Sequence, residues 1–422
     1  MALSLVYADE AGRIYIHDKL TAMGLNGPSF SELTQVVPLP AGASLVMLPG
    51  RAPVGLDRSS GRMQPVDSGS KWAVGALLPA GYVRTLLPAY KAWEECPRLP
   101  FFGYTAVGSH GGRLYAAALP IDHLRSRWSP RFYNTKTLPD RIARLQRIFP
   151  GNRLVEHLSG CSLGYQCFTA QNLFYERWEA GIPSSRRCNA RCLGCISNQE
   201  EDVPPAPHIR IGFTPSKDEI VALAVHHLDR ARDGIISFGQ GCEGEPSLES
   251  DLLAGAVKEI RRQTHRGTIN INTNGGSVED LARLVDAGLD AMRVSLFSGQ
   301  EETFMAYHRP RGFDLADVAN SIRMARSQGV VVSLNLLTFP GLTDRPGEVG
   351  ALLDFIGETG IEMVQLRNLS GDPAWLAEAF PMTEKTLGIP GLIKCLQAKH
   401  PSLRIGSFTH PAASFRRRRG SR

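Results

Sequence analysis

The stretch Arg187-Cys188-Asn189-Ala190-Arg191-Cys192-Leu193-Gly194-Cys195-Ile196 carries three of the eight cysteines of the chain in a Cys-x3-Cys-x2-Cys spacing. A short loop with three thiolates supplies three of the four ligands that a cubane [4Fe–4S] cluster ordinarily takes from cysteine. A missing fourth protein ligand leaves one iron open, as catalytic metal sites keep an open position. The spacing therefore predicts an iron–sulfur centre with one accessible iron. A zinc site that lacks its fourth ligand is the alternative interpretation.

Helices and strands alternate after this loop. Apolar or alternating stretches typical of strands are separated by stretches with helical periodicity. The predicted strands lie at 234–239, 267–275, 291–296, 330–337 and 363–367, and 403–408 reads as one more. Such an alternation implies right-handed crossovers and a parallel sheet.

Two of these strands end in motifs suited to binding a ligand. The first is Gln240-Gly241-Cys242-Glu243-Gly244-Glu245-Pro246, and the second is Thr273-Asn274-Gly275. Glycines at a strand end let the backbone approach a ligand closely. Glu245 offers a carboxylate to an ammonium group, and Asn274 offers an amide for hydrogen bonding, although Asn also suits the backbone angles of a turn.

The cysteine loop, the Gly244-Glu245-Pro246 run and the ordered strand ends together resemble the radical S-adenosylmethionine (radical SAM) enzymes. Glu243 departs from that family, which has a glycine there. The resemblance implies an α/β fold, a partial (β/α)6 barrel over residues 183–370. It also implies a [4Fe–4S] cluster on Cys188, Cys192 and Cys195, with SAM bound to the open iron. Gly244, Glu245, Asn274 and Ser295 would position SAM.

The activity that this resemblance implies is reductive cleavage of SAM to a 5′-deoxyadenosyl radical, which abstracts hydrogen from an unknown substrate. It also implies an external one-electron donor of the flavodoxin or ferredoxin type. Inward-facing polar residues near strand ends of such a barrel are catalytic candidates. In this chain they are Arg293, Asn335, Gln365 and Arg367. Their alternative role is to satisfy one another inside the barrel.

The remainder of the chain divides by composition. Residues 1–135 predict a small β-rich or α+β accessory domain, with hairpins at 4–17 and 104–119. Residues 136–182 predict a helical bridge, with helices at 140–149 and 168–178. Residues 371–422 predict a carboxyl-terminal extension that ends in the basic run Arg416–Arg419.

Five cysteines lie outside the loop, and their roles stay open. Cys161 and Cys167 either join a second metal site or are free buried thiols, the commoner state. Cys242 is either a packing residue or a reactive thiol near the radical. RNA methylation would require a thiol pair, for which Cys242 with Cys395 is the pairing available.

Whole-chain properties limit the partners. The net charge of +6 permits a nucleic-acid partner without requiring one. Basic and aromatic residues interleave between Arg125 and Lys136, a pattern that also occurs on solvated faces. The chain has no run of about 18 apolar residues, so we expect no membrane span. No secretory signal is expected, so we predict a cytoplasmic protein. An RNA-modifying enzyme and a non-catalytic iron–sulfur or zinc protein, binding nucleic acid or sensing redox state, are the alternative functions.

Overall fold

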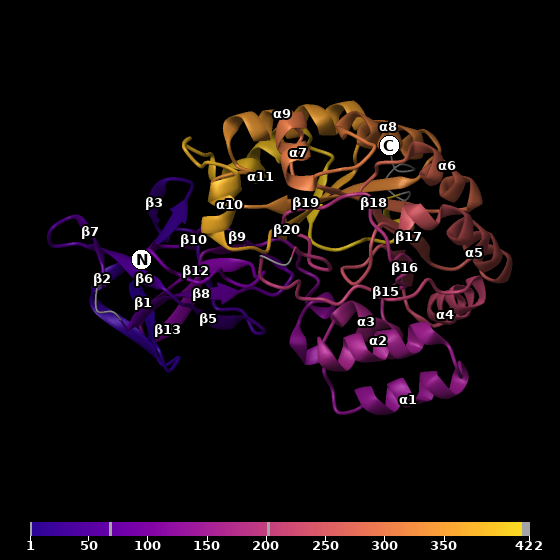
Figure 1. The fold of residues 1–422 in the computed structure, drawn as a ribbon, viewed down its shortest axis with the longest axis horizontal. Helices are drawn as coiled ribbons and strands as arrows, with labels where there is room; N and C mark the ends of the chain where they lie inside the picture. The colour runs from indigo at the N-terminus through magenta and orange to yellow at the C-terminus, as the bar shows by residue number, and fades with distance from the viewer. Residues whose placement is uncertain (1, 67–69, 201–202, 416–422) are drawn as a thin grey trace.

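The computed structural model of the chain describes residues 2–66, 70–200 and 203–415. Its amino-terminal part is a β assembly at one end of the molecule (Figure 1). The strands pair antiparallel, mainly in a 12-stranded sheet with the central order β11-β6-β2-β1-β8-β12-β13-β4. Their bounds are β1 (Ser4–Asp9), β2 (Ile14–Asn26), β3 (Ser29–Glu32), β4 (Val37–Pro38), β5 (Ser44–Leu48), β6 (Arg51–Asp57), β7 (Arg62–Pro65), β8 (Lys71–Leu77), β9 (Tyr82–Arg84), β10 (Leu87–Pro88), β11 (Tyr90–Ala92), β12 (Tyr104–His110), β13 (Arg113–Ala116) and β14 (Ala118–Pro120).

Both predicted hairpins of this part are present. Strands β1 and β2 pair with Val6 opposite Ile16, and β12 and β13 pair with Val107 opposite Ala116. The predicted β-rich character of the amino-terminal region is therefore confirmed.

Three helices follow and pack beneath the rest of the chain as drawn in Figure 1. They are α1 (Leu138–Ile148), α2 (Arg153–Gly164) and α3 (Phe168–Tyr175). Helix α2 begins at an Asn152 cap, whose side chain accepts hydrogen bonds from the backbone N–H groups of Leu154 and Val155. Buried apolar residues of all three helices belong to the large hydrophobic core of the protein.

The carboxyl-terminal part of the chain, from residue 179 to 406, contains a seven-stranded parallel sheet in the sequential order β15 to β21. The strands are β15 (Glu179–Gly181), β16 (Ile235–Phe238), β17 (Thr268–Thr273), β18 (Ala291–Leu296), β19 (Val331–Thr338), β20 (Met363–Asn368) and β21 (Arg404–Gly406). The sheet curls into a partial barrel, which confirms the predicted α/β architecture. Strand β21 corresponds to the additional strand predicted at 403–408, whereas β15 was not located from the sequence.

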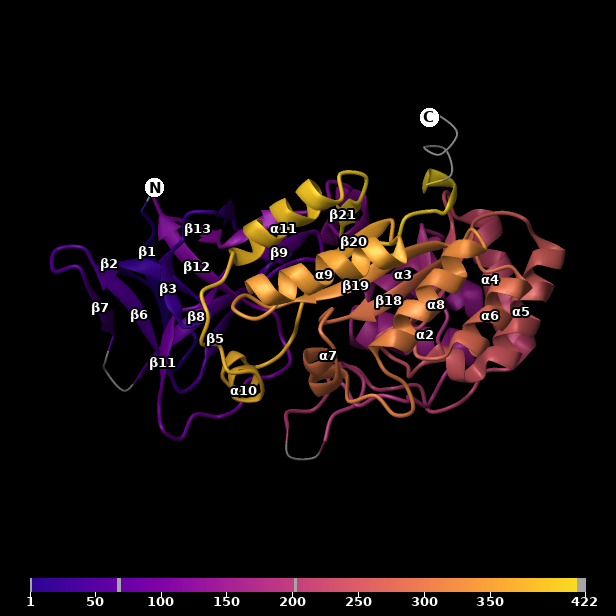
Figure 2. The same cartoon turned by 90° about the horizontal axis from the view of Figure 1, so that it is seen from above.

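Helices cover the outer face of this sheet (Figures 1 and 2). They are α4 (Lys217–Arg230), α5 (Ser250–Gln263), α6 (Val278–Ala287), α8 (Leu315–Ser327), α9 (Pro346–Thr359) and α11 (Gly388–Lys399). Two short helices, α7 (Glu301–His308) and α10 (Pro373–Ala379), follow β18 and β20 and share a separate hydrophobic cluster with Leu193 of the cysteine loop. Within the described ranges, no helix combines the length and apolar character that crossing a membrane requires.

Strand periodicity separates a dry outer face from a polar inner one. In β17, Ile269 and Ile271 belong to the hydrophobic core, whereas the amide of Asn270 donates to Ser237 Oγ (3.0 Å) and to Asn272 Oδ1 (2.9 Å). Because successive side chains of a strand point to opposite faces, the polar residues line the inside of the half-barrel. The candidate site is built on this inner face.

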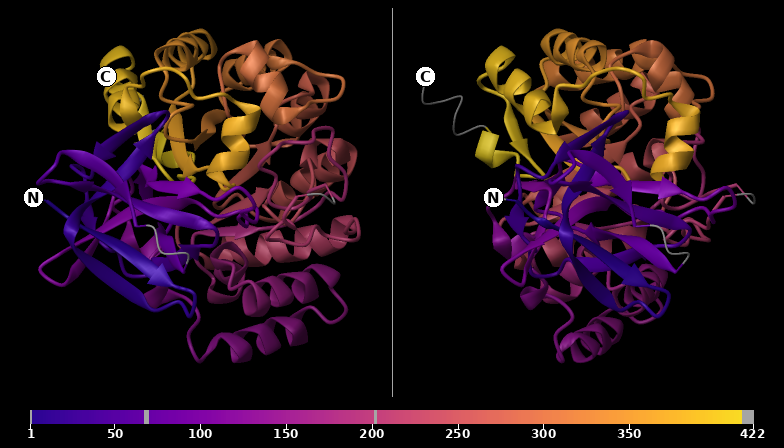
Figure 3. Two further views of the ribbon diagram at one scale, coloured as in Figure 1. Left: turned by 60° about the vertical axis from the view of Figure 1, so that its left-hand side comes forward. Right: turned by 90° about the vertical axis from the view of Figure 1, so that its left-hand side faces the viewer.

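Buried charged groups fasten the amino-terminal assembly beside the carboxyl end of β20. Arg84 Nη2 donates to the Leu369 carbonyl (2.6 Å), and its backbone N–H donates to Asn368 Oδ1 (2.9 Å). Arg51 and Asp372 form an ion pair at 2.6 Å with side chains only 1% and 4% exposed. Viewed end-on in Figure 3, the amino-terminal strands lie in front of the barrel. The assembly is therefore held close to the open side of the half-barrel.

Candidate functional site

The cysteine loop connects β15 to α4 and lies against the end of α7. The Leu193 N–H donates to the Tyr307 carbonyl (3.0 Å), and the Arg191 N–H donates to the His308 carbonyl (3.1 Å). Residues Ala190 and Pro310 form an isolated antiparallel bridge. These backbone contacts fix the loop without using any of its three thiols, which are half-buried and unbonded to other cysteines.

Polar side chains surround two of the thiols. Cys192 Sγ lies 3.3 Å from His308 Nδ1, and Cys195 Sγ lies 3.8 Å from Arg210 Nη2. Burial raises the pKa of Cys188 to about 11 and raises that of Cys192 well above its usual range, and the negative charges of neighbouring thiols and Glu245 add to both pKa shifts. The three sulfur atoms therefore lie close enough to influence one another's ionisation.

Their spacing exceeds that of a single-ion site. Among the described residues, the loop thiols do not form a set whose ligand atoms all lie within 4.8 Å of one another. A tetrahedral zinc ion with bonds of about 2.3 Å holds its sulfur ligands only about 3.8 Å apart. The wider arrangement suits a larger unit with several iron atoms, so the residues present fit a [4Fe–4S] cluster better than one zinc ion.

Gly244 allows the loop after β16 to reach the cysteine loop. Its N–H donates to the Ser185 carbonyl (2.8 Å), and the next N–H, of Glu245, donates to the Arg187 carbonyl (2.7 Å). A Cβ atom at position 244 would lie 1.9 Å from the Arg187 oxygen. Only glycine permits this approach, which places the Gly244-Glu245-Pro246 run directly beside Cys188.

Glu243, the departure from the family pattern, has a structural role in this loop. Its Oε2 accepts from the backbone N–H groups of Ser184 (2.7 Å) and Ser185 (3.0 Å) and from the Ser184 hydroxyl (3.0 Å). Its Oε1 accepts from the N–H groups of Gly239 (2.6 Å) and Gln240 (2.7 Å). One buried carboxylate thus ties the chain entering the cysteine loop to the chain leaving β16.

The residues predicted to position SAM lie at adjacent strand ends. Glu245 is 4% exposed and accepts from Thr273 Oγ1 (2.6 Å), the Ser247 N–H (3.0 Å) and the Asn274 N–H (2.7 Å). Asn274 donates through its side chain to Asn189 Oδ1 in the cysteine loop (2.6 Å). Ser295 lies on β18, the next strand, and is half-buried. The structure therefore brings Gly244, Glu245 and Asn274 together with the cysteines.

The predicted catalytic candidates form a second group, on β18 to β20. Arg293 Nη1 donates to Gln365 Oε1 (3.1 Å) and to Thr409 Oγ1 (3.2 Å), and Gln365 Nε2 donates to Ser333 Oγ (3.3 Å). Asn335 lies directly between Ser295 and Gln365 in the strand register. Arg293 and Arg367 both line an interior cavity, whereas Gln365 is fully buried beneath it.

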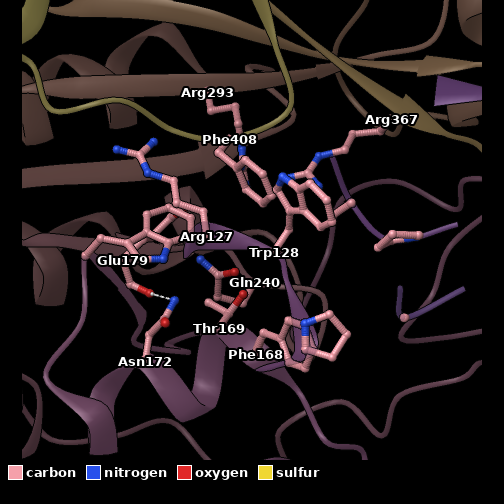
Figure 4. Close-up of a pocket in the computed structure, with 15 residues that line it drawn as sticks. Arg127, Trp128, Phe168, Thr169, Asn172, Glu179, Gln240, Arg293, Arg367 and Phe408 are labelled. Atoms are coloured by element: carbon pink, nitrogen blue, oxygen red, sulfur yellow. Dashed lines mark hydrogen bonds between the residues drawn. The ribbon is translucent and has the colours of Figure 1, made fainter. Parts of the chain in front are cut away.

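That cavity has a volume of about 230 Å³ and lies between the half-barrel, the helical bridge and the amino-terminal assembly (Figure 4). Arg127, Arg293 and Arg367 line it from different segments of the chain. Its other lining residues are Gly42, Pro79, Ala80, Trp128, Pro130, Phe168, Thr169, Asn172, Trp178, Glu179, Gln240 and Phe408.

The cavity is positively charged. Among the described residues, none of its three arginines forms an ion pair with a carboxylate. The one acid in its wall, Glu179, instead accepts from Ser237 Oγ (2.6 Å) and Thr409 Oγ1 (3.1 Å). Burial lowers the pKa of Arg367 to about 10, so it stays protonated at neutral pH. Unpaired buried charge is costly, so these arginines would favour an anion over a cation in this cavity.

Sequence reasoning missed most of this wall. Arg127 and Trp128 were noticeable only as part of a basic and aromatic run, whereas Arg127 stacks on Trp178 at 4.8 Å. Basic residues of the neighbouring helix α1 also contact the protein, such as Arg144, which forms an ion pair with Glu176 at 3.6 Å. No sequence motif predicted that Glu179 or Phe408 would line a site. The basic run Arg416–Arg419 lies outside the described residues.

The fold changes the thiol pairing expected of Cys242. The thiol beside Cys242 is that of Cys161, and the two sulfur atoms lie within 4.8 Å of each other. Cys395 lies on α11, packed against the main hydrophobic core. The suggested pairing of Cys242 with Cys395 is therefore replaced by a pairing with the helical bridge.

Comparison with known proteins identifies a shared region. Residues 182–356 match the family model described as the radical SAM superfamily. The chain is 30% identical over 183 residues to the GTP 3′,8-cyclase of Ectopseudomonas mendocina (strain ymp), covering 42% of this chain and 50% of that one. It is 28% identical over 185 residues to the molybdenum cofactor biosynthesis protein moc-5 of Caenorhabditis elegans, covering 43% and 28%. The chain spans half or less of the length of these two relatives.

Among solved structures, Streptococcus suis SuiB bound to the precursor peptide SuiA is similar at 16% identity with a TM-score of 0.39. The match covers 58% of this chain and 54% of that one.

Proposed function

We propose that this chain is a radical SAM enzyme, because residues 182–356 match the family model of the radical SAM superfamily. Cys188, Cys192 and Cys195 would hold a [4Fe–4S] cluster, and the open iron would bind SAM. When bound, the two cofactors together supply a carbon-centred radical that abstracts hydrogen from a substrate. The observation that carries the proposal is the packing of the cysteine loop onto Gly244 at the carboxyl ends of the parallel strands.

The polypeptide provides orientation around these cofactors. The Glu243 carboxylate fixes the backbone on both sides of the cysteine loop, and the Glu245 carboxylate fixes Asn274. We propose that Gly244, Glu245, Asn274 and Ser295 form the SAM side of the site. The buried position of the two carboxylates keeps water from competing for the backbone groups that they hold.

We further propose that the substrate carries an anionic group, such as a carboxylate or phosphate, beside a flat ring. Arg127, Arg293 and Arg367 supply donors in fork geometry, which match these anions. Trp128, Trp178 and Phe408 supply aromatic faces in the same cavity. Asn335 and Gln365, on neighbouring strands, complete the substrate side that we assign.

One partner and one cellular location follow from this proposal. Radical generation requires an external one-electron donor of the flavodoxin or ferredoxin type. A reducing location such as the cytoplasm would preserve the cluster, and the eight cysteines are all free in the structure.

The proposal is tested by anaerobic reconstitution with iron and sulfide, followed by a strong reductant and SAM. We expect the wild-type protein to form 5′-deoxyadenosine and Cys192→Ala to form none. Cys96→Ala, a half-buried cysteine of the amino-terminal part, is the matched control and should keep the wild-type yield. No product from the wild type, or an equal yield from Cys192→Ala, would refute the proposal.

A further inference from the structure

A second set of metal-ligand side chains lies outside the cysteine loop. His157 and Cys161 come from α2, and Cys242 comes from the loop after β16. Their ligand atoms all lie within 4.8 Å of one another, the one set among the described residues that meets this limit. His157 Nε2 is 3.7 Å from Cys161 Sγ. His157 and Cys161 are four residues apart, so one face of the helix presents both.

We propose that His157, Cys161 and Cys242 bind a structural zinc ion. Tetrahedral zinc with bonds of about 2.0 to 2.3 Å separates its ligand atoms by about 3.3 to 3.8 Å. The 3.7 Å contact between His157 and Cys161 has this separation before any ion is present. Imidazole and thiolate together favour zinc over the hard cations magnesium and calcium, which require oxygen ligands.

His208 is the fourth ligand that the geometry favours. It lines the same cavity of about 190 Å³ as Cys161 and Cys242, two of the three assigned ligands. Cys167 also faces this cavity, from the N-cap position of α3, but it is not a member of the set whose ligand atoms lie within 4.8 Å of one another.

The ion would join three segments that surround the cysteine loop. The His208 N–H donates to the Ile196 carbonyl (3.0 Å), directly after Cys195. The Ile211 N–H donates to the Cys242 carbonyl (2.7 Å), and Glu243 follows Cys242 in the chain. Zinc would therefore fasten the helical bridge to both the cysteine loop and the glycine-containing loop. This role does not depend on radical chemistry, so the two proposals fail separately.

The experiment substitutes the three iron-binding cysteines and measures the zinc content of the protein. A full-length chain with Cys188→Ala, Cys192→Ala and Cys195→Ala is purified under reducing, anaerobic conditions, and its metals are quantified by mass spectrometry. We expect about one zinc per chain. Adding Cys161→Ser or Cys242→Ser should lower the zinc content at least about fivefold, whereas adding Cys395→Ser should leave it unchanged.

Cobalt identifies the ligands independently of the stability of these variants. The zinc-free protein of the same background is titrated with Co²⁺, and its visible absorption is recorded. We expect bands typical of tetrahedral thiolate coordination, weakened by His208→Ala and absent with Cys161→Ser. Circular dichroism verifies that each variant is folded, and Cys242→Ser replaces Cys161→Ser if the latter does not fold.

Several results would overturn the assignment. They are less than about one fifth of a zinc per chain, zinc retained at full content by both serine variants, or iron instead of zinc on these ligands. A disulfide between Cys161 and Cys242 in the anaerobically purified protein, detected as a loss of two hydrogens and resistance to alkylation, would also overturn it.

Discussion

The cysteine loop and the His157–Cys161–Cys242 set each offer three soft ligands, but they are built in opposite ways. The loop draws its ligands from eight consecutive positions, 188 to 195, and spaces the sulfurs too widely for one ion. The second set draws on a helix and a distant loop, at positions 157 to 242, and brings its ligand atoms within 4.8 Å. The spacing of residues in the sequence therefore reveals a metal site only when all of its ligands come from one loop.

The thiols of the two regions also differ in ionisation. Burial among other thiols raises the pKa of Cys188 to about 11. Hydrogen bonds from Cys242 and His157 lower the pKa of Cys161 to about 5. Cys188 and Cys192 thus need a cation to ionise at neutral pH, whereas the second set already favours one thiolate.

The largest expected effect separates the two regions by their metals. Cys192→Ala should reduce formation of 5′-deoxyadenosine at least about 100-fold, because one of three cluster ligands is lost. Cys161→Ala should keep the iron content and lose only zinc. Iron and zinc per chain, measured beside product formation, check both. Loss of iron in Cys161→Ala would show that the regions are not independent.

A smaller effect is expected at Glu243, which lies between the two regions. Glu243→Gln places an amide NH2 group against backbone donors that a carboxylate oxygen now accepts. We expect the free energy of unfolding to fall by about 2 to 3 kcal/mol, the cost of leaving buried donors unsatisfied. Denaturant titration of the apoprotein measures it. The exposed Glu302→Gln is the control, with an expected change within about 0.5 kcal/mol.

The charged cavity should respond in both binding and stability. Arg367→Met removes a half-buried cation of the cavity wall for which no ion pair is found among the described residues, so we expect unfolding to become less favourable by about 1 kcal/mol. Pyrophosphate, used as an anionic probe, should bind about tenfold more weakly, since about 1.4 kcal/mol of attraction is lost. Calorimetric titration and thermal melts check the two effects. Arg323→Met, at an exposed position of α8, should change neither, and an equal response there would contradict the assignment.

The smallest effect concerns how α2, which carries two zinc ligands, is attached to α4. Arg153 Nη2 and Glu219 Oε2 form an ion pair at 2.6 Å, and this pair lowers the pKa of Glu219 to about 2. Because Arg153 is half exposed, Arg153→Ala should cost only about 0.5 kcal/mol.

The pH dependence of that cost follows from the lowered pKa of Glu219. The stabilisation is present above the ordinary value of 4.5 and is lost as the pH falls toward 2, where the folded protein also takes up the proton. Unfolding curves of wild type and variant between pH 7 and pH 3 should therefore converge on acidification. Curves that diverge would contradict the ion pair.

Much of the barrel was predictable because its signals are local. The alternation in Thr268–Thr273 places Ile269 and Ile271 toward the helices, as the strand period requires. The hairpins β1–β2 and β12–β13 followed from short alternating stretches around turns. The boundaries of the four predicted regions and the roles of Asn335 and Ser295 stay predictions.

The cavity wall was not predictable because its residues share no segment. Arg127 precedes the sheet, Arg293 and Arg367 lie on separate strands, and Phe408 follows the last one. The role of Glu243 was also not predictable from the sequence, where it is only a departure from a glycine motif. The fold shows the role, because it places five hydrogen-bond donors around the carboxylate.

By itself, the sequence determined the cysteine loop and the alternation of strands and helices, since each depends on neighbours within a short segment. Only the tertiary structure decided which distant thiol faces Cys242 and which arginines share a cavity. Those contacts arise when separate segments pack together, and no local spacing or periodicity encodes them.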